Sequence, residues 1–363
     1  MSVYLVIFLL FFLDLIVIPI GISPFETPKV IVAEIIIDIL LLLQIFKSRI
    51  NLKHLYNSQI IFIGILFILS LDTQLLFQPK GGFFGNVFRL QGQFLLWHLF
   101  LFSIISKNIQ LNNIPKFFYY LSITCLLIST LLLGVNENNR AFGTLGEPNA
   151  LAAISLFIFP FVWFYSKSIF KLASIITTLA IILLSGSRAG LLGFLIQIIF
   201  IFLSWKILHK KLGLAVIFCM VLIAISITLP FIENVGWFEN RSEIWITSFK
   251  SGLTSPFIGQ GFGNIQNLIH QTAFELNNNV QYQIVDSSHN FLLDFWIQGG
   301  IVAITSIIIL IGLSTQNFIK TRKFPELTAF LGIIIAMLFN PVSVVILLAF
   351  WWLIGQGFST KHD

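Results

Sequence analysis

Long apolar runs with almost no charges constrain the fold of this chain more than any other feature. Of its 363 residues 57% are hydrophobic and only 10% are charged, whereas a soluble domain carries about 25% charged residues. A bilayer core of about 30 Å is crossed by roughly 20 residues of helix. The runs lack the alternating polarity of membrane strands, which favours helices. The sequence therefore predicts an all-α integral membrane protein.

Polar breaks between the apolar runs predict about twelve transmembrane helices. They lie near residues 2–20, 29–46, 59–76, 92–106, 117–135, 149–166, 169–185, 188–205, 212–230, 290–315, 326–340 and 342–358. The pair Gly299-Gly300 predicts that the tenth run is a short entering helix followed by a full span. We read the first run as a retained span, because it has no basic segment before it and no cleavage site. We expect one polytopic domain, 1–363, with a large extracytoplasmic loop at 231–287.

Basic residues divide unevenly when the loops alternate from a cytoplasmic N-terminus. The predicted inner side has fourteen: Lys47, Arg49, Lys53, Lys107, Lys116, Lys167, Lys171, Lys206, Lys210, Lys211, Lys320, Arg322, Lys323 and Lys361. The predicted outer side has seven: Lys29, Lys80, Arg89, Arg140, Arg188, Arg241 and Lys250. Because inner loops of membrane proteins are enriched in Lys and Arg, both termini are predicted to be cytoplasmic.

Four of the six arginines fall on the outer side, where topology disfavours them. A guanidinium binds phosphate oxygens with two parallel hydrogen bonds and keeps its proton. The placement therefore indicates an anionic substrate at the outer face. The alternative is scatter in a small sample together with ordinary surface ion pairs.

Three residues beside or within the large loop are the catalytic candidates. Arg188 starts the eighth run in Ser185-Gly-Ser-Arg-Ala-Gly190, where Ser187 is expected to cap a helix whose free N–H groups attract anions. Arg241 begins an amphipathic segment, and His289 precedes the tenth run and is suited to accept a proton near neutral pH. The plainer interpretations are a headgroup contact for Arg188, a salt bridge to Glu239 or Glu243 for Arg241, and a packed interfacial histidine.

Other ionisable residues within apolar runs are open to two interpretations. Glu34 and Asp38 share one helix face, as a proton relay or, as we favour, an interhelical hydrogen-bond pair. Asp14 has no assigned role, and Asp294 is a candidate neighbour of His289. The other histidines are read as packing residues. Since no cluster has metal-ligand spacing and no nucleotide loop is present, we expect no metal and no cofactor.

Five segments in order resemble the O-antigen ligase family, which includes O-antigen and exopolysaccharide polymerases. They are Arg140-Ala-Phe-Gly-Thr-Leu-Gly-Glu-Pro-Asn-Ala150, Ser185-Gly-Ser-Arg-Ala-Gly190, Asn240-Arg-Ser-Glu-Ile-Trp245, Pro256-Phe-Ile-Gly-Gln-Gly-Phe-Gly263 and Ser288-His-Asn-Phe-Leu292 with Gln298-Gly-Gly300. The resemblance covers roughly residues 137–315. The segment at Gln298 departs from the family, which often has an acidic residue there.

The resemblance implies a GT-C-like glycosyltransferase in the bacterial inner membrane, with its active site facing the periplasm. Such enzymes take a glycan from undecaprenyl pyrophosphate and pass it to lipid A-core, to another lipid-linked repeat, or in related members to a protein. By resemblance, Arg188 and Arg241 bind pyrophosphate and His289 is the catalytic base, while Arg140, Asn149 and Asn290 are expected to bind substrate. Ligase and polymerase share these motifs, so lipopolysaccharide ligation and polysaccharide polymerisation both remain open.

Two other classes of function compete with the enzyme. A transporter or flippase for an anionic solute or lipid also explains many spans and outward arginines, but the sequence has no internal repeat or paired broken helices. A passive scaffold of an export complex explains the hydrophobicity but not the placement of the arginines. A glycosyltransferase accounts for both features.

Overall fold

The structure is a computed structural model that describes residues 2–19, 22–46, 58–76, 82–107, 109, 115–136, 138–207 and 241–358. Within these ranges the chain is helical and has no strand beyond one isolated bridge between Val135 and Ala141. The predicted all-α class is thus confirmed for the described part of the chain.

The helices follow the predicted runs closely, often to within about two residues. The α-helices are α1 (Ser2–Phe11), α2 (Thr27–Phe46), α3 (Ser58–Leu76), α4 (Gln93–Ser106), α5 (Phe117–Leu132), α6 (Pro148–Tyr165), α7 (Ser168–Ser185), α8 (Arg188–Ile207), α10 (Arg241–Leu253), α11 (Ile265–Glu275), α12 (Phe291–Thr321), α13 (Phe324–Phe339) and α14 (Val344–Gln356). Short 3₁₀ turns are η1 (Leu13–Leu15), η3 (Gly143–Leu145) and η5 (Asn279–Tyr282). The first helix is shorter than predicted, and the predicted span at 212–230 lies outside the described residues.

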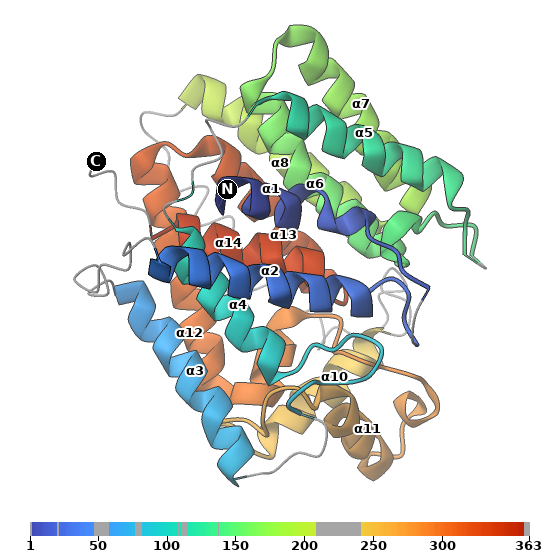
Figure 1. Cartoon of the computed structure of the whole chain (residues 1–363). Helices are drawn as coiled ribbons and strands as arrows, with labels where there is room; N and C mark the ends of the chain where they lie inside the picture. The colour runs from blue at the N-terminus through green and yellow to red at the C-terminus, as the bar shows by residue number, and fades with distance from the viewer. Residues whose placement is uncertain are drawn as a thin grey trace.

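Helices α6, α13 and α14 form the centre of the molecule (Figure 1). Helix α13 packs against α6 and α8, and α14 packs against α4. Nearly every residue of α13 and α14 is buried. A helix that is apolar on all sides must be enclosed by other helices. The other helices therefore surround this apolar centre, with α5 and α7 together on one side and α3 beside α12 on another.

Helix α12 breaks at Gly300, whose φ of 61° and ψ of −158° are not helical. The break frees backbone groups, and the loop after α10 binds them. The N–H of Ile301 donates to the carbonyl of Pro256 (2.8 Å), and the carbonyls of Ile297 and Gln298 accept from the N–H groups of 260 and 261 (2.9 Å each). The predicted break at Gly299-Gly300 is confirmed, and the glycine-rich loop 256–261 pairs with it. That the second part of α12 is a full membrane span stays a prediction.

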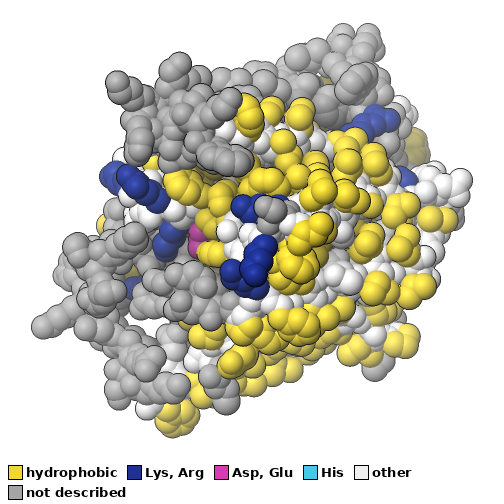
Figure 2. All heavy atoms as spheres, turned by 90° about the horizontal axis from the view of Figure 1, so that it is seen from above, with side chains coloured by type: hydrophobic (Ala, Val, Ile, Leu, Met, Phe, Trp, Pro, Cys, Tyr) yellow, Lys and Arg dark blue, Asp and Glu magenta, His cyan; other side chains and the backbone are white. Residues whose placement is uncertain are grey.

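Several helix termini lie together at one end of the bundle. The amide of Gln356, at the end of α14, donates to the carbonyl of Ser106 (2.8 Å), at the end of α4. Lys323, which precedes α13, donates to the carbonyl of Gln356 (3.2 Å). Tyr120, near the start of α5, donates to Ser166, which follows α6 (2.5 Å). Several basic residues predicted for the inner side flank these termini. Figure 2 shows one face of the molecule, on which basic side chains lie in separate groups among apolar ones.

By length and composition, α6 and α12 are long and apolar enough to cross a membrane. Eight other helical stretches of the described residues are apolar but shorter, at 10–17 residues. The apolar helical architecture agrees with the predicted membrane protein. The number of about twelve spans, the GT-C-like class and the orientation of the termini stay predictions.

The segment between α10 and α12 forms a small helical unit with its own apolar cluster. Its buried residues are Ile244, Ile269, Ala273, Val280, Val285 and Ile297. Because Ile297 belongs to α12, this cluster fixes the unit on the first half of that helix. Residues 231–240 of the predicted loop lie outside the described part, and the extracytoplasmic placement of the loop stays a prediction.

Two helical glycines provide a test of the central packing. A Cβ on Gly355 would lie 2.2 Å from the carbonyl oxygen of Ser103, whereas a Cβ on Gly312 would have no atom within 4 Å. We expect Gly355→Ala to lower the free energy of unfolding by about 1–3 kcal/mol, because α14 must move away from α4. Gly312→Ala should be neutral or stabilising by up to about 1 kcal/mol. Thermal unfolding in detergent measures both, and equal stability of the two variants would contradict this packing.

Candidate functional site

The start of α6 lies beside one predicted arginine. The Nη2 of Arg140 donates to Oδ1 of Asn149 (2.7 Å), and its Nε donates to the carbonyl of Ser185 (2.8 Å), the last residue of α7. Arg140 thereby joins the beginning of α6 to the turn between α7 and α8. The two residues predicted to bind substrate on this side are therefore in direct contact with each other.

Arg188 begins α8 after a tight turn. Gly186 has a left-handed φ of 60°, and the side chain of Arg140 covers it. The hydroxyl of Ser187 accepts from the N–H of Gly190 (3.1 Å), so the predicted cap is confirmed. A Cβ on Gly190 would lie 2.8 Å from the Cβ of Ala152, which places the first turn of α8 against that of α6. Arg188 is exposed at this end of the bundle.

Arg241 begins α10 and contacts the end of α13. Its Nη1 donates to the carbonyl of Phe339, the last residue of that helix. Glu243, one of the two ion-pair partners considered from the sequence, accepts from Asn279 (3.4 Å). The other, Glu239, lies outside the described residues. Arg241 therefore stabilises a helix C-terminus, where free carbonyls favour a cation.

His289 lies in the turn that precedes α12, with a left-handed φ of 59° that is uncommon for a residue other than glycine. The hydroxyl of Ser287 accepts its N–H (3.3 Å), and the next residue, Asn290, caps α12 by accepting from Leu292 and Leu293. The Nδ1 of His289 is buried and has no hydrogen-bond partner among the described residues. The carboxamide oxygen of Asn290 is used within the fold, so its substrate contact stays a prediction.

A network around Arg89 was not predicted from the sequence, in which Arg89 was only one of the arginines assigned to the outer side. Its Nε donates to Oδ2 of Asp286, and its Nη1 lies 3.6 Å from Oε2 of Glu147. The three side chains are mostly buried. Glu147 directly precedes α6, so this network and Arg140 flank the same helix start. The only signal in the sequence was an arginine on the side that topology disfavours.

The charges of this region act on His289 and Glu147 together. Burial and, to a smaller extent, the guanidinium groups of Arg241 and Arg89 lower the pKa of His289 to about 4, while the carboxylate of Asp286 opposes them. Burial is the largest cause that raises the pKa of Glu147 to about 7, with Asp286 and Glu26 acting in the same direction and Arg89 and Arg241 opposing it. Both groups therefore feel the same two arginines. His289 is neutral at pH 7, as a proton acceptor must be.

The turn between α13 and α14 holds these charged residues in place. The carbonyl of Val342 accepts from Gln91 (2.6 Å) and from Nη1 of Arg89 (3.4 Å), and the N–H of Val344 donates to Glu26 (3.1 Å). Together with Arg241 at the end of α13, these contacts give partners to backbone groups at the two helix ends.

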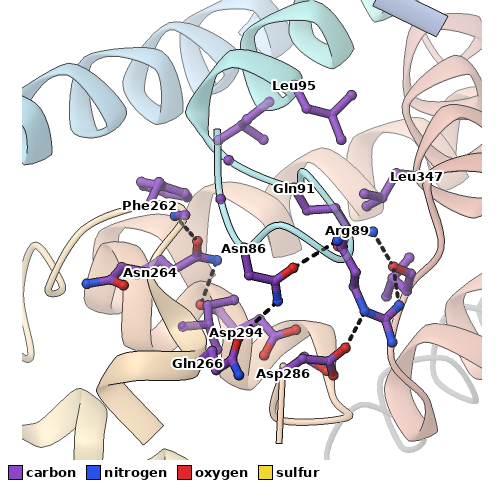
Figure 3. A pocket seen from close by; sticks show the side chains of 18 of the residues that line it. Asn86, Arg89, Gln91, Leu95, Phe262, Asn264, Gln266, Asp286, Asp294 and Leu347 are labelled. Carbon is purple, nitrogen blue, oxygen red and sulfur yellow. Dashed lines mark hydrogen bonds and ion pairs between the residues drawn. The ribbon is translucent and has the colours of Figure 1, made fainter. Parts of the chain in front are cut away.

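A cavity of 320 Å³ opens beside this network. Figure 3 shows Arg89 and Gln91 on the loop before α4, Asn264 on the loop before α11, Asp286 on the chain entering α12 and Asp294 in the first turn of α12. Asp294 accepts from the N–H of Ser288 (2.8 Å), so it holds the turn that carries His289. Asp294 lines the cavity, whereas His289 is not among the lining residues, and a cavity shared by the two stays a prediction.

Two of the other candidates lie in contact between helices. The Nε2 of His98 on α4 lies 3.3 Å from Oδ1 of Asp38 on α2, and Nδ1 of His98 contacts the carbonyl of Phe94 (2.8 Å), so His98 is a packed histidine. The choice between relay and hydrogen-bond pair for Glu34 and Asp38 stays a prediction. Among the described residues, no group of three His, Cys, Asp or Glu side chains could hold a metal ion.

Comparison with known families adds one finding. Residues 172–308 match the family model described as O-antigen ligase. The match runs from α7 into α12 and includes the three catalytic candidates, while Arg140 and Asn149 lie before it. It supports the family resemblance stated from the motifs. No curated protein matches the chain.

Arg89 offers a test of the network. We expect Arg89→Met to lower the free energy of unfolding by about 3 kcal/mol, because it leaves two mostly buried carboxylates uncompensated. The double variant Arg89→Met/Asp286→Asn should lose less than the sum of the two single variants. Chemical unfolding in detergent measures the cycle, with Lys250→Met on the exposed face of α10 as control. Additive losses would contradict the coupling of these side chains.

Proposed function

We propose that this chain is an inner-membrane glycosyltransferase, because its residues 172–308 match the O-antigen ligase family. It takes a glycan from undecaprenyl pyrophosphate and joins it to an acceptor hydroxyl at the periplasmic face. The acceptor is lipid A-core for a ligase or another lipid-linked glycan for a polymerase. The family match supports glycosyl transfer in general, and the donor and the residue roles are our proposal.

One observation carries this proposal: charged groups from distant parts of the chain surround the start of α6. Arg140 binds Asn149 there, and Arg89 pairs with Glu147 two residues earlier. Arg188 begins the helix packed against the same turn. Arg241 acts on both Glu147 and His289. A transferase for a diphosphate-linked donor needs such cationic groups beside a base.

Arg188, Arg241 and Arg140 are proposed to stabilise the leaving diphosphate. As the bond between the anomeric carbon and the phosphate oxygen breaks, negative charge grows on the diphosphate. Charge-assisted hydrogen bonds from guanidinium groups strengthen as this charge develops, and so lower the barrier. The free N–H groups at the capped start of α8 add partial positive charge beside Arg188. In this proposal arginines provide the neutralisation, and no metal is required.

His289 is proposed to take the proton of the acceptor hydroxyl. The acceptor oxygen attacks the anomeric carbon, undecaprenyl pyrophosphate departs from the opposite side, and the configuration inverts. The low pKa of His289 makes it a weak base in the free protein. A bound diphosphate places negative charge beside Arg241 and so raises that pKa toward neutrality. Donor binding would thus prepare the base for catalysis.

Transport of an anionic lipid is a second candidate, and the break of α12 at Gly300 favours it because transporters use interrupted helices at their substrate sites. In this chain the backbone groups at the break bind the loop 256–261. Backbone groups that already have protein partners are poorly placed to bind a substrate. The transferase therefore explains the break better, as the support for the loop between α10 and α11.

The function is tested with purified protein in detergent. Given lipid-pyrophosphate-linked glycan and no nucleotide, the wild type should form new glycosidic product, and single additions or a ladder distinguish ligase from polymerase. His289→Ala should lose about 10²–10⁴-fold in turnover, because general base catalysis contributes that much. His98→Ala, which removes a packed histidine, is the matched control. Wild-type turnover in His289→Ala would refute the base assignment, and no product in any sample would refute the function.

The pH dependence follows from the pKa of about 4 for His289. The base works only as neutral imidazole, and kcat/KM for the donor reports the donor-free protein. This kcat/KM should therefore stay constant as pH falls from 7 to about 5 and then decline through pH 4. Arg241→Gln removes a charge that lowers this pKa, so its decline should begin at higher pH. Recovery of activity when a sample exposed to low pH is returned to pH 7 would exclude irreversible unfolding as the cause of the decline. A wild-type midpoint near 6.5, or the same midpoint in Arg241→Gln, would contradict the electrostatic coupling.

A further inference from the structure

The cavity beside Arg89 has an unusual concentration of side-chain carboxamides. Six of its lining residues are Asn86, Gln91, Asn264, Gln266, Asn267 and Gln298. Each carboxamide offers two donors and an acceptor without carrying a charge. A wall of this composition suits a ligand that also donates and accepts many hydrogen bonds without charge.

These carboxamides hold one another in place. The Nδ2 of Asn86 donates to Oε1 of Gln266 (3.2 Å), and the Nδ2 of Asn267 donates to Oδ1 of Asn264 (2.6 Å). The Oδ1 of Asn86 also accepts the backbone N–H of Arg89 (2.8 Å). Figure 3 shows Asn86, Asn264 and Gln266 near one another beside the pocket. The wall is therefore arranged before any ligand arrives.

Part of their hydrogen-bonding capacity is left over. Among the described residues, the Nε2 of Gln266, the Nδ2 of Asn264 and the Oε1 of Gln91 have no protein partner. Two NH₂ groups and one acceptor oxygen are thus available to a ligand in the cavity. Hydroxyl groups, which both donate and accept, can meet all three.

Aromatic rings provide the apolar part of the cavity. Phe88, Phe262, Phe291, Phe295 and Trp351 all line it. A sugar ring has apolar C–H groups on its faces and hydroxyls at its edge, so it matches a cavity that combines aromatic rings with carboxamides. The volume of 320 Å³ lies at the low end of ligand pockets, which span about 300–1,000 Å³.

The charges disfavour a diphosphate in this cavity. Its charged lining residues are Arg89, Asp286 and Asp294, one cation and two acids. The guanidinium of Arg89 is already engaged by Asp286 and Glu147. An anionic ligand would therefore meet more repulsion than attraction, whereas a neutral polyol would not.

We infer that this cavity is the acceptor-sugar subsite, which holds one neutral sugar unit of the acceptor glycan. The inference rests on the proposed function and extends it from the reaction to the recognition of one substrate. Ser287 lines the cavity and lies two residues before His289, and Asp294 of the cavity wall binds the N–H of Ser288. A sugar bound there has its hydroxyls beside the turn that carries the base. In the proposed function the donor diphosphate binds to Arg140, Arg188 and Arg241, which do not line the cavity.

Steady-state kinetics of the full-length protein with varied donor and varied acceptor test this subsite. Asn264→Ala and Gln266→Ala should each raise the KM for the acceptor about two- to tenfold, as expected for the loss of one neutral hydrogen bond. The KM for the lipid-pyrophosphate donor and the kcat at saturating acceptor should not change. Gln271→Ala is the matched control, because Gln271 is an exposed carboxamide on α11 outside the cavity. An unchanged acceptor KM, or equal rises in both KM values, would overturn the assignment.

A binding measurement without donor separates this inference from the reaction. Saturation-transfer NMR probes methyl glycosides of a neutral hexose and an N-acetylhexosamine, and phosphorus NMR probes inorganic pyrophosphate. At least one glycoside should bind the wild type and lose binding in Asn264→Ala/Gln266→Ala, while pyrophosphate binding is unaffected. No glycoside binding, or pyrophosphate binding lost in the double variant, would overturn the sugar site. If glycosides bind this cavity but no glycan is transferred, the proposed function fails. The acceptor role then fails as well, and the cavity is only a sugar-binding site.

Discussion

Backbone groups left free at helix breaks and helix ends must find partners inside the protein, because hydrocarbon offers none. Two such places shape the described part of this molecule. At the Gly300 break the loop 256–261 pairs with the backbone of α12, and at the turn between α13 and α14 the partners are side chains of Arg241, Gln91 and Glu26. Unpaired, each group would cost roughly 2–7 kcal/mol. The fold of this region and the position of its charged residues therefore depend on the same hydrogen bonds.

The same hydrogen bonds hold the fold and position the charged residues, which explains why arginines lie among carboxylates rather than alone. Arg89 faces Asp286 and Glu147, so the free protein does not hold uncompensated positive charge in a buried place. Breaking such a pair exposes one charge to a low-dielectric surrounding, which is far more costly than the pair itself. Arg140, beside the turn between α7 and α8, donates instead to the neutral groups of Asn149 and Ser185.

The helices were predictable from the sequence because apolar runs of membrane length have few alternative structures. The Gly299-Gly300 break and the Ser187 cap were also predicted, since both depend on local residue chemistry. The network of Arg89, Glu147 and Asp286 was not, because its members are separated by up to 197 positions and only tertiary packing joins them. The segment at 256–263 was read as part of a family pattern, and its physical role required the hydrogen bonds to α12.

The turn at residues 287–290 connects the two halves of the proposed site. Ser287 and Asn290 fix its backbone, and Asp294 ties it to the first turn of α12. These bonds hold His289 at a positive φ, a conformation that costs a non-glycine residue of order 1–3 kcal/mol. An unconstrained turn would relax and rotate the imidazole away. The constraint keeps the imidazole, whose Nδ1 is buried, within the electrostatic influence of Arg241, Asp286 and Arg89, the charges among which the proposed reaction takes place.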